Sequence, residues 1–220
     1  MPQQPVHQSW HALSEEILTG MHAWRQQHPK ATLREMETEV DARLARLRAR
    51  MLEDMALQSA AADWEPVHVA DQPQCPQCGV PLKPRGKQTR HLQTHGGREL
   101  TLERRYGVCP SWQEGFSPLD EELGLLPGSL TPRLQESLTR LGTWIASFDK
   151  AAEELAWFTQ VEVSKATATR ITEAAGAAAV AVQTAAVECI AREYPTPAVW
   201  PDTLLVSADG AMCPCARGNV

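Results

Sequence analysis

The hydrophobic positions between residues 30 and 62 recur at steps of three and four residues, which is the period of one face of an α-helix. The positions between them are mostly Glu, Asp and Arg. The stretch therefore predicts a long amphipathic helix whose apolar stripe packs within its own domain. The alternative is a short coiled coil with a second copy of the chain, since the stripe extends over about three heptads. The stripe consists of Leu33, Met36, Val40, Leu44, Leu47, Met51 and Met55.

A strand-like pattern follows at residues 88–109, "QTRHLQTHGGRELTLERRYGVC". Gly96-Gly97 is a turn signal between two arms, and Leu100 and Leu102 alternate with polar residues in the second arm. The segment predicts a β-hairpin with one mostly polar face. The preceding residues 71–84 contain four prolines and predict a loop.

The pattern becomes helical again from residue 118, and no proline lies between Pro132 and Pro195. Residues 147–176 have the spacing of a helix-turn-helix, with a first helix at 149–158 and a turn at 159–163. Ser164 is a good N-cap for the second helix. Short polar and basic side chains on the outer face of that helix suit contacts with the major groove and with phosphates. These are Lys165, Thr167, Thr169 and Arg170, and an ordinary helical hairpin is the alternative.

Two patterns in the sequence argue against a membrane protein. The N-terminus lacks the charged and then apolar layout of a signal peptide. The alanine-rich residues 174–191 are interrupted by Gln183, Thr184 and Glu188, so no run of about 18 apolar residues exists. We therefore expect a cytoplasmic protein without a membrane partner.

Charge adds a local feature to this picture. The net charge of −6 argues against a chain that is basic throughout. Residues 83–105, however, hold seven Lys and Arg against two Glu, and such a patch favours phosphate contact. The candidates for DNA contact in this patch are Arg85, Lys87, Arg90, Arg104 and Arg105.

The cysteines suggest a metal site. Cys75 and Cys78 form a Cys-x-x-Cys pair followed by Gly, which is typical of a zinc knuckle. Cys109 ends the predicted hairpin, but Trp112 occupies the position of a second pair's other cysteine. Three interpretations of these cysteines stay open. The cysteines bind zinc with His91, His95 or water as fourth ligand, or they belong to a ribbon that folds poorly without metal, or Cys75 and Cys78 form a redox pair.

A strand-like run, "LLVSADG", delivers Asp209 at its end. An aspartate before glycine is common in turns. The functional alternative is the first carboxylate of an RNase H-like site, in which several carboxylates hold two metal ions. No Asp or Glu follows Asp209 in the sequence.

In this order the segments resemble those of ISKra-type insertion-sequence transposases. The resemblance covers roughly residues 30–220 and rests on "CPQCG", "RRYGVCPSW", "GFSPLDEELGL", "VEVSKATATRITEAAG" and "VSADGAM". It implies a helical N-terminus, a zinc ribbon, a helix-turn-helix and an RNase H-like domain with an Asp-Asp-Glu triad, which uses Mg²⁺ or Mn²⁺ in a complete member. It further implies transposon ends as the DNA partner, Asp209 as the first catalytic aspartate, a recognition helix from Lys165 to Arg170, and zinc at Cys75, Cys78 and Cys109.

The family pattern has a fourth cysteine and further acidic residues that this sequence lacks. We therefore expect a truncated transposase that binds DNA and is catalytically inactive alone. Its fold class is mainly α, with a small β zinc-ribbon-like hairpin, a helix-turn-helix and the truncated first strand of an RNase H-like domain. We expect a helical N-terminal region at 1–70 and a zinc-ribbon-like module at 71–118. A helical domain with the helix-turn-helix follows at 119–194, and residues 195–220 form a hinge and the first strand of the truncated catalytic domain.

Three alternatives stay open. The first is a DNA-binding regulator that dimerises through residues 30–62. The second is half of a split transposase that a second polypeptide completes in trans. The third is a chain that does not fold stably, with residues 198–220 disordered because a first strand without sheet partners leaves its backbone groups unpaired.

Overall fold

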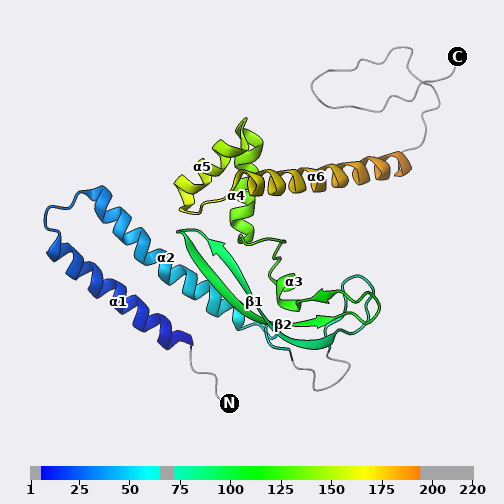
Figure 1. Ribbon diagram of the computed structural model, residues 1–220, viewed down its shortest axis with the longest axis horizontal. Coiled ribbons are helices and arrows are strands. Elements are labelled where there is room, and N and C mark those ends of the chain that lie inside the picture. The colour runs from blue at the N-terminus through cyan, green and yellow to red at the C-terminus, as the bar shows by residue number, and fades with distance from the viewer. Residues whose placement is uncertain (1–5, 65–71, 194–220) are drawn as a thin grey trace, which may run out of the picture. The chain divides into compact units, whose positions relative to one another are not determined.

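A computed structural model describes residues 6–64 and 72–193, with side chains described for 10–64 and 72–187 (Figure 1). These residues are mainly helical and include a three-stranded antiparallel sheet, which confirms the coarse fold class. The chain divides into two compact units, one ending at Ala174 and the other beginning at Ala175. Residues 175–193 of the second unit are helical. None of the described helices has the length and apolar character needed to cross a membrane.

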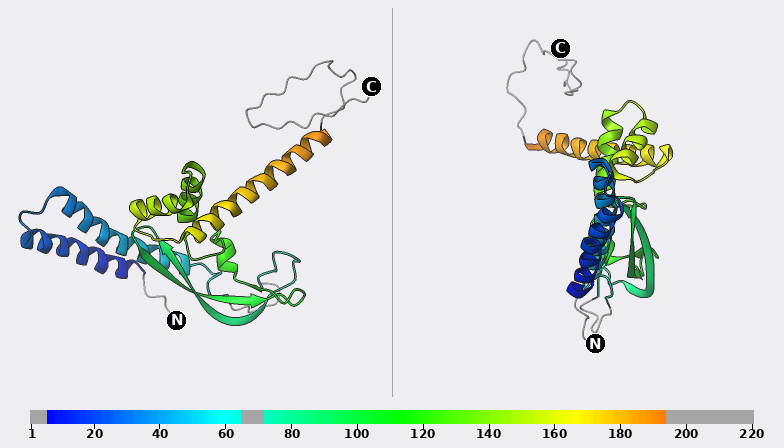
Figure 2. Two further views of the ribbon diagram at one scale, coloured as in Figure 1. Left: turned by 45° about the horizontal axis from the view of Figure 1, so that its top comes forward. Right: turned by 90° about the vertical axis from the view of Figure 1, so that its left-hand side faces the viewer.

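In the first unit, α1 (Val6–Gln27) and α2 (Leu33–Leu57) form an antiparallel helical hairpin (Figure 2). A capping box starts α2, because the Glu35 amide donates to the Thr32 hydroxyl and the Thr32 amide donates to the Glu35 carboxylate. The Glu16 carboxylate of α1 accepts from Arg46 of α2 at 2.8 Å. The sequence thus correctly predicts the second helix, within slightly wider limits.

The apolar stripe of α2 packs only in part, because Met36, Leu47 and Met51 are half-buried and the other four stripe residues are exposed. The buried side chains of α2 are Ala45 and Ala49. Leu33 of the stripe is 69% exposed and Met55 is 57% exposed. The hairpin tip approaches α2 closely, since a Cβ added at Gly96 would lie 2.4 Å from the Cβ of Ala45.

The sheet consists of β1 (Lys83–Thr94), β2 (Arg98–Val108) and the short β3 (Gly115–Phe116), in that order. The predicted hairpin is confirmed, and its turn places Gly96 and Gly97 at positive φ angles of 87° and 63°. Pairing puts the leucines of both strands on the face toward α2. That core consists of Ala49, Leu92, Leu100 and Leu102.

The short helix α3 (Pro118–Glu122) is tied to the hairpin by one carboxylate. Asp120 accepts from Arg104 of β2 at 2.6 and 2.8 Å and from Arg90 of β1 at 2.8 Å. Arg90 also donates to the carbonyls of Leu126 and Gly128. These bonds fix the chain that leads from the sheet to the next helices.

Three helices complete the described fold, namely α4 (Pro132–Trp144), α5 (Phe148–Thr159) and α6 (Lys165–Glu193). Within the first unit, the start of α6 packs with α4 and α5 around Leu138 and Leu155, which are fully buried. The hairpin tip meets this group, because the Gly96 amide donates to the Thr159 carbonyl at 2.8 Å. The hairpin therefore contacts α2 on one side and α5 at its tip.

We expect Asp120→Asn to lower the free energy of unfolding by about 2 kcal/mol, because two largely buried guanidinium groups lose a shared partner. The side chains of Arg104, Arg90 and Asp120 are 10%, 15% and 20% exposed. Urea denaturation followed by far-UV circular dichroism measures the change. Asp149→Asn is the matched control, since its pair with Lys165 is more than half exposed and should matter by less than about 0.5 kcal/mol. Equal losses in both variants would contradict this reading.

Candidate metal centre and nucleic-acid interface

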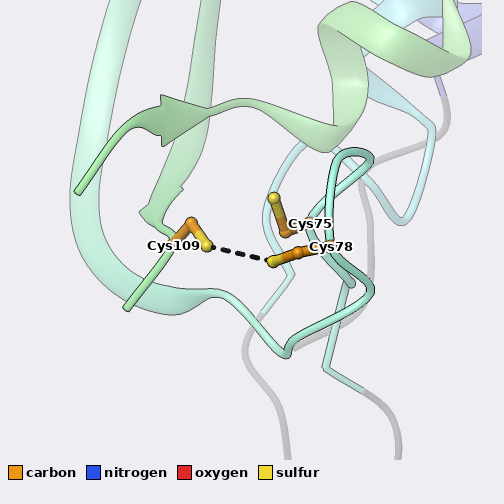
Figure 3. A group of neighbouring side chains, drawn as sticks. All are labelled: Cys75, Cys78 and Cys109. Carbon is orange, nitrogen blue, oxygen red and sulfur yellow. Dashed lines mark hydrogen bonds between the residues drawn. The ribbon is translucent and has the colours of Figure 1, made fainter. Parts of the chain in front are cut away.

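Three cysteine sulfurs from two separate parts of the sequence lie together (Figure 3). The Sγ atoms of Cys75, Cys78 and Cys109 are all within 4.8 Å of one another, and those of Cys78 and Cys109 are 3.5 Å apart. Strand pairing explains this proximity, because Lys83 at the start of β1 pairs with Val108 at the end of β2. The loop before β1 and the residue after β2 are thereby brought together at the open end of the hairpin.

The first two cysteines lie on a tight turn. The Gly79 amide donates to the Cys75 carbonyl at 2.8 Å, and the Cys75 amide donates to the Val80 carbonyl at 2.9 Å. Gly79 has a φ of 71°, which a glycine adopts without strain. Cys78 occupies the fourth position of this turn, with its side chain exposed.

The third cysteine lies on a turn with the same hydrogen bonds. The Gln113 amide donates to the Cys109 carbonyl at 2.9 Å, and the Cys109 amide donates to the Glu114 carbonyl at 2.9 Å. Gln113 has a φ of 59°, like its counterpart in the first turn. Trp112 therefore takes the position that Cys78 has in the first turn, and its side chain is 57% exposed. The second knuckle has formed without its second cysteine.

The local environment treats the two buried thiols differently. Burial raises the pKa of the Cys75 thiol, and its two thiol neighbours act in the same direction. Burial also opposes ionisation of Cys109. The amides of Trp112 and Ser111, together with the neighbouring thiols, outweigh it and hold the pKa of Cys109 below its ordinary value.

Neither histidine completes the group, so the suggestion of His91 or His95 as fourth ligand is wrong in this structure. His91 lies eight positions along β1 from Lys83, about 26 Å away at the usual rise of a strand. Its ring is hydrogen-bonded to Glu99 at 2.8 Å. His95 lies at the hairpin tip beside α2. Within the part of the chain that the structure describes, no fourth Cys, His, Asp or Glu joins the three cysteines, which could bind a metal such as zinc.

The two helices and the turn predicted at residues 147–176 are present, but α6 continues to Glu193, well past the predicted end near residue 175. The Thr167 amide donates to the Ser164 hydroxyl at 3.2 Å, so Ser164 caps α6 as predicted. Gln160 ends α5 in the left-handed conformation, with a φ of 58°. The inward positions are also correct, because Leu155 and Ala168 are fully buried.

The four candidate residues for DNA contact lie along the first turns of α6. Lys165 and Arg170 are exposed, and Thr167 and Thr169 are half-buried. Lys165 forms a 3.0 Å ion pair with Asp149 at the start of α5. The Thr169 hydroxyl donates to the Lys165 carbonyl, which lies one helical turn earlier in α6. All four belong to the same end of one helix.

Two of the five hairpin cations, Arg90 and Arg104, already have a carboxylate partner within the fold. Arg104 is 8% exposed and Arg90 is half-buried, and both bind Asp120. Their partner Asp120 lies outside residues 83–105, so a count of the charges within those residues does not include it. Buried guanidinium groups held by a carboxylate are not free to meet phosphates.

A second acid from outside residues 83–105 forms ion pairs with two more cations. Asp63 binds Lys87 at 2.8 Å and Arg105 at 2.8 Å. Hydrogen bonding to Lys87 is the main cause that lowers the pKa of Asp63, and the same bond raises the pKa of Lys87. Arg85 is exposed on β1, and no ion pair of this side chain occurs among the described residues. The basic patch is therefore much weaker in the fold than in the sequence.

Asp209 lies outside the described residues, as does the strand predicted before it. Comparisons of the chain with protein-family models, with curated proteins and with solved structures find no match. The cysteine group and the α5–α6 segment are therefore interpreted from their own chemistry.

We expect Cys109→Ser to weaken zinc binding by about 100-fold or more, because it removes one of three thiolates from the site. Competition with a chromophoric zinc chelator measures the affinity. Cys189→Ser makes the same chemical change in the other compact unit and should leave the affinity unchanged. Similar affinities in Cys109→Ser and the unmodified chain would show that zinc binds elsewhere.

Proposed function

We propose that this chain binds double-stranded DNA at the ends of an insertion sequence, as the DNA-recognising N-terminal part of an ISKra-type transposase. The observation that carries the proposal is the capped start of α6 after the turn that follows α5. Four side chains able to contact bases or phosphates project from its first six residues, Lys165 to Arg170. A helix that begins with such residues after a short turn is the arrangement by which helix-turn-helix proteins enter the major groove.

The physical chemistry of this helix end favours DNA. The first amide groups of a helix point outward and carry partial positive charge, which attracts a phosphate. Lys165 and Arg170 add full charges on the exposed surface. The ion pair of Lys165 with Asp149 is exposed and weak, so a phosphate can replace the carboxylate at small cost.

The hairpin has a supporting role in this proposal. Its paired cations contribute little to phosphate binding, while Arg85 remains exposed on β1. A zinc ion, where bound by the three cysteines, would be a structural cross-link between the loop before β1 and the turn after β2. That cross-link would stabilise the small core of Trp64, Leu82 and Phe116 around the buried cysteines. In this proposal, the residues that the structure describes recognise DNA and do not cleave its strands.

Titration of the purified chain with duplexes of the flanking terminal repeats and with random duplex tests the proposal. The two series are run at one fixed salt concentration, with and without zinc, because affinity for DNA depends strongly on salt. We expect the repeat ends to bind at least about 10-fold more tightly than random duplex. Equal affinity for both would contradict recognition of the ends.

Substitution of Arg170 by Ala should weaken binding to the repeat ends by about 10-fold, because one exposed cation of the α6 surface is lost. Fluorescence anisotropy with labelled duplex measures the loss. Arg34→Ala removes another exposed cation, from the first turn of α2, and should change the affinity by less than about twofold. If Arg34→Ala is as damaging as Arg170→Ala, binding depends on overall charge and not on α6.

A second candidate function is a DNA-binding regulator that works as a dimer, and the exposed stripe of α2 favours it. The stripe repeats every 11 residues from Leu33 through Leu44 to Met55, which keeps it on one face of an almost straight helix. Leu44 is 49% exposed, and a groove of about 660 Å³ beside it is lined by Met51, Met55 and the aromatic side chains of α5. The occupant that fits such a stripe is α2 of a second copy, because the same apolar face is then buried on both.

Leu44→Glu should convert the dimer of this second candidate to a monomer, since it places a charge at the centre of the shared apolar face. Sedimentation equilibrium measures the mass. Leu18→Glu is the matched control, because Leu18 is 65% exposed on α1 and lies outside the stripe. An unmodified chain that sediments as a monomer at micromolar concentration would remove the regulator hypothesis.

A further inference from the structure

We infer that the three-cysteine group binds a soft metal ion that is satisfied by three thiolates, in preference to zinc. The inference deepens the metal centre of the proposed function and is independent of DNA binding. It begins with the match between the two cysteine turns. Because their backbone hydrogen bonds correspond, the fourth corner of a tetrahedral site falls on the second turn, at Trp112.

Trp112 cannot fill that corner. The nitrogen lone pair of an indole belongs to the aromatic ring, and its N–H is only a donor. The side chain is 57% exposed and so does not close the site from solvent either. Among the described residues the group has three members, and these residues supply three sulfur donors and no fourth ligand.

Zinc and larger soft ions respond differently to such a donor set. Structural zinc sites use four protein ligands in a tetrahedron. With three thiolates, zinc must take its fourth ligand from water or another solute and loses one strong bond. A large soft ion such as Pb²⁺ accepts three thiolates in a pyramid, because its own lone pair occupies the fourth side. Thiolate softness favours such ions further.

The three-cysteine group is open to solvent on one side. Cys75 and Cys109 are buried, whereas Cys78 is exposed, so an ion reaches the group from the side of Cys78. A hydrogen bond from Gln77 to Glu114, 3.2 Å long, connects the two turns beside the sulfurs. The Glu114 carboxylate already has a partner, and the turns are held together without a fourth cysteine.

Lead is the probe that tests the inference. The full chain is used with its other three cysteines replaced (Cys189→Ser, Cys213→Ser and Cys215→Ser), so that only the group can bind. Titration with Pb²⁺ should give one ion per chain and the near-ultraviolet absorption of sulfur-to-lead charge transfer. Competition between Pb²⁺ and Zn²⁺ then gives the ratio of their affinities.

We expect Trp112→Cys to lower the lead-to-zinc affinity ratio by about 100-fold, since a fourth thiolate strengthens zinc binding far more than lead binding. Trp112→Ala is the matched control, because it removes the indole without adding a ligand, and it should keep the ratio of the parent chain. Far-UV circular dichroism checks that both variants fold.

Two results would overturn the inference. One is an affinity ratio that is the same in the parent chain and in Trp112→Cys. The other is X-ray absorption of the zinc-loaded parent chain showing a fourth protein ligand, sulfur or histidine nitrogen, at the metal. Neither result bears on the titrations with DNA, so the two proposals fail separately.

Discussion

The antiparallel pairing of β1 with β2 is the interaction on which the rest of the first unit depends. At the open end of the hairpin, it brings Cys109 to the loop that carries Cys75 and Cys78. At the closed end, the glycine turn contacts α2 and donates a hydrogen bond to α5. A one-residue slip of this register would exchange the buried and exposed faces of both strands. It would therefore disrupt the metal centre and the contact with α5 together.

Paired charges are the second organising feature, and they change how the basic hairpin is interpreted. Asp120 and Asp63 are distant in sequence from most of the cations that they bind. Asp120 fixes α3 against the sheet through two arginines that are largely removed from water. Asp63 neutralises cations on the outward face. Lys165 and Arg170 at the start of α6, in contrast, are exposed.

The sequence predicts the local elements well because their signals are local. The Gly96-Gly97 turn and the Ser164 cap each act within a few residues, and each lies where its turn or helix requires. The three cysteines could also be recognised, since knuckle spacing is a short-range pattern. Contacts between residues that are distant in the sequence could not be recognised in the same way. Neither the use of Ala45 in place of the leucine stripe nor the pairing of Arg104 with Asp120 leaves a periodic signal, because both depend on how separate elements meet.

The central claim is that the start of α6 recognises DNA, and amide hydrogen exchange of the full chain with and without the repeat-end duplex tests it most directly. The account predicts slower exchange at residues 165–172 on DNA binding, with little change along the outward face of β1. Protection confined to residues 83–94, or no protection in α6 at saturating DNA, would contradict it.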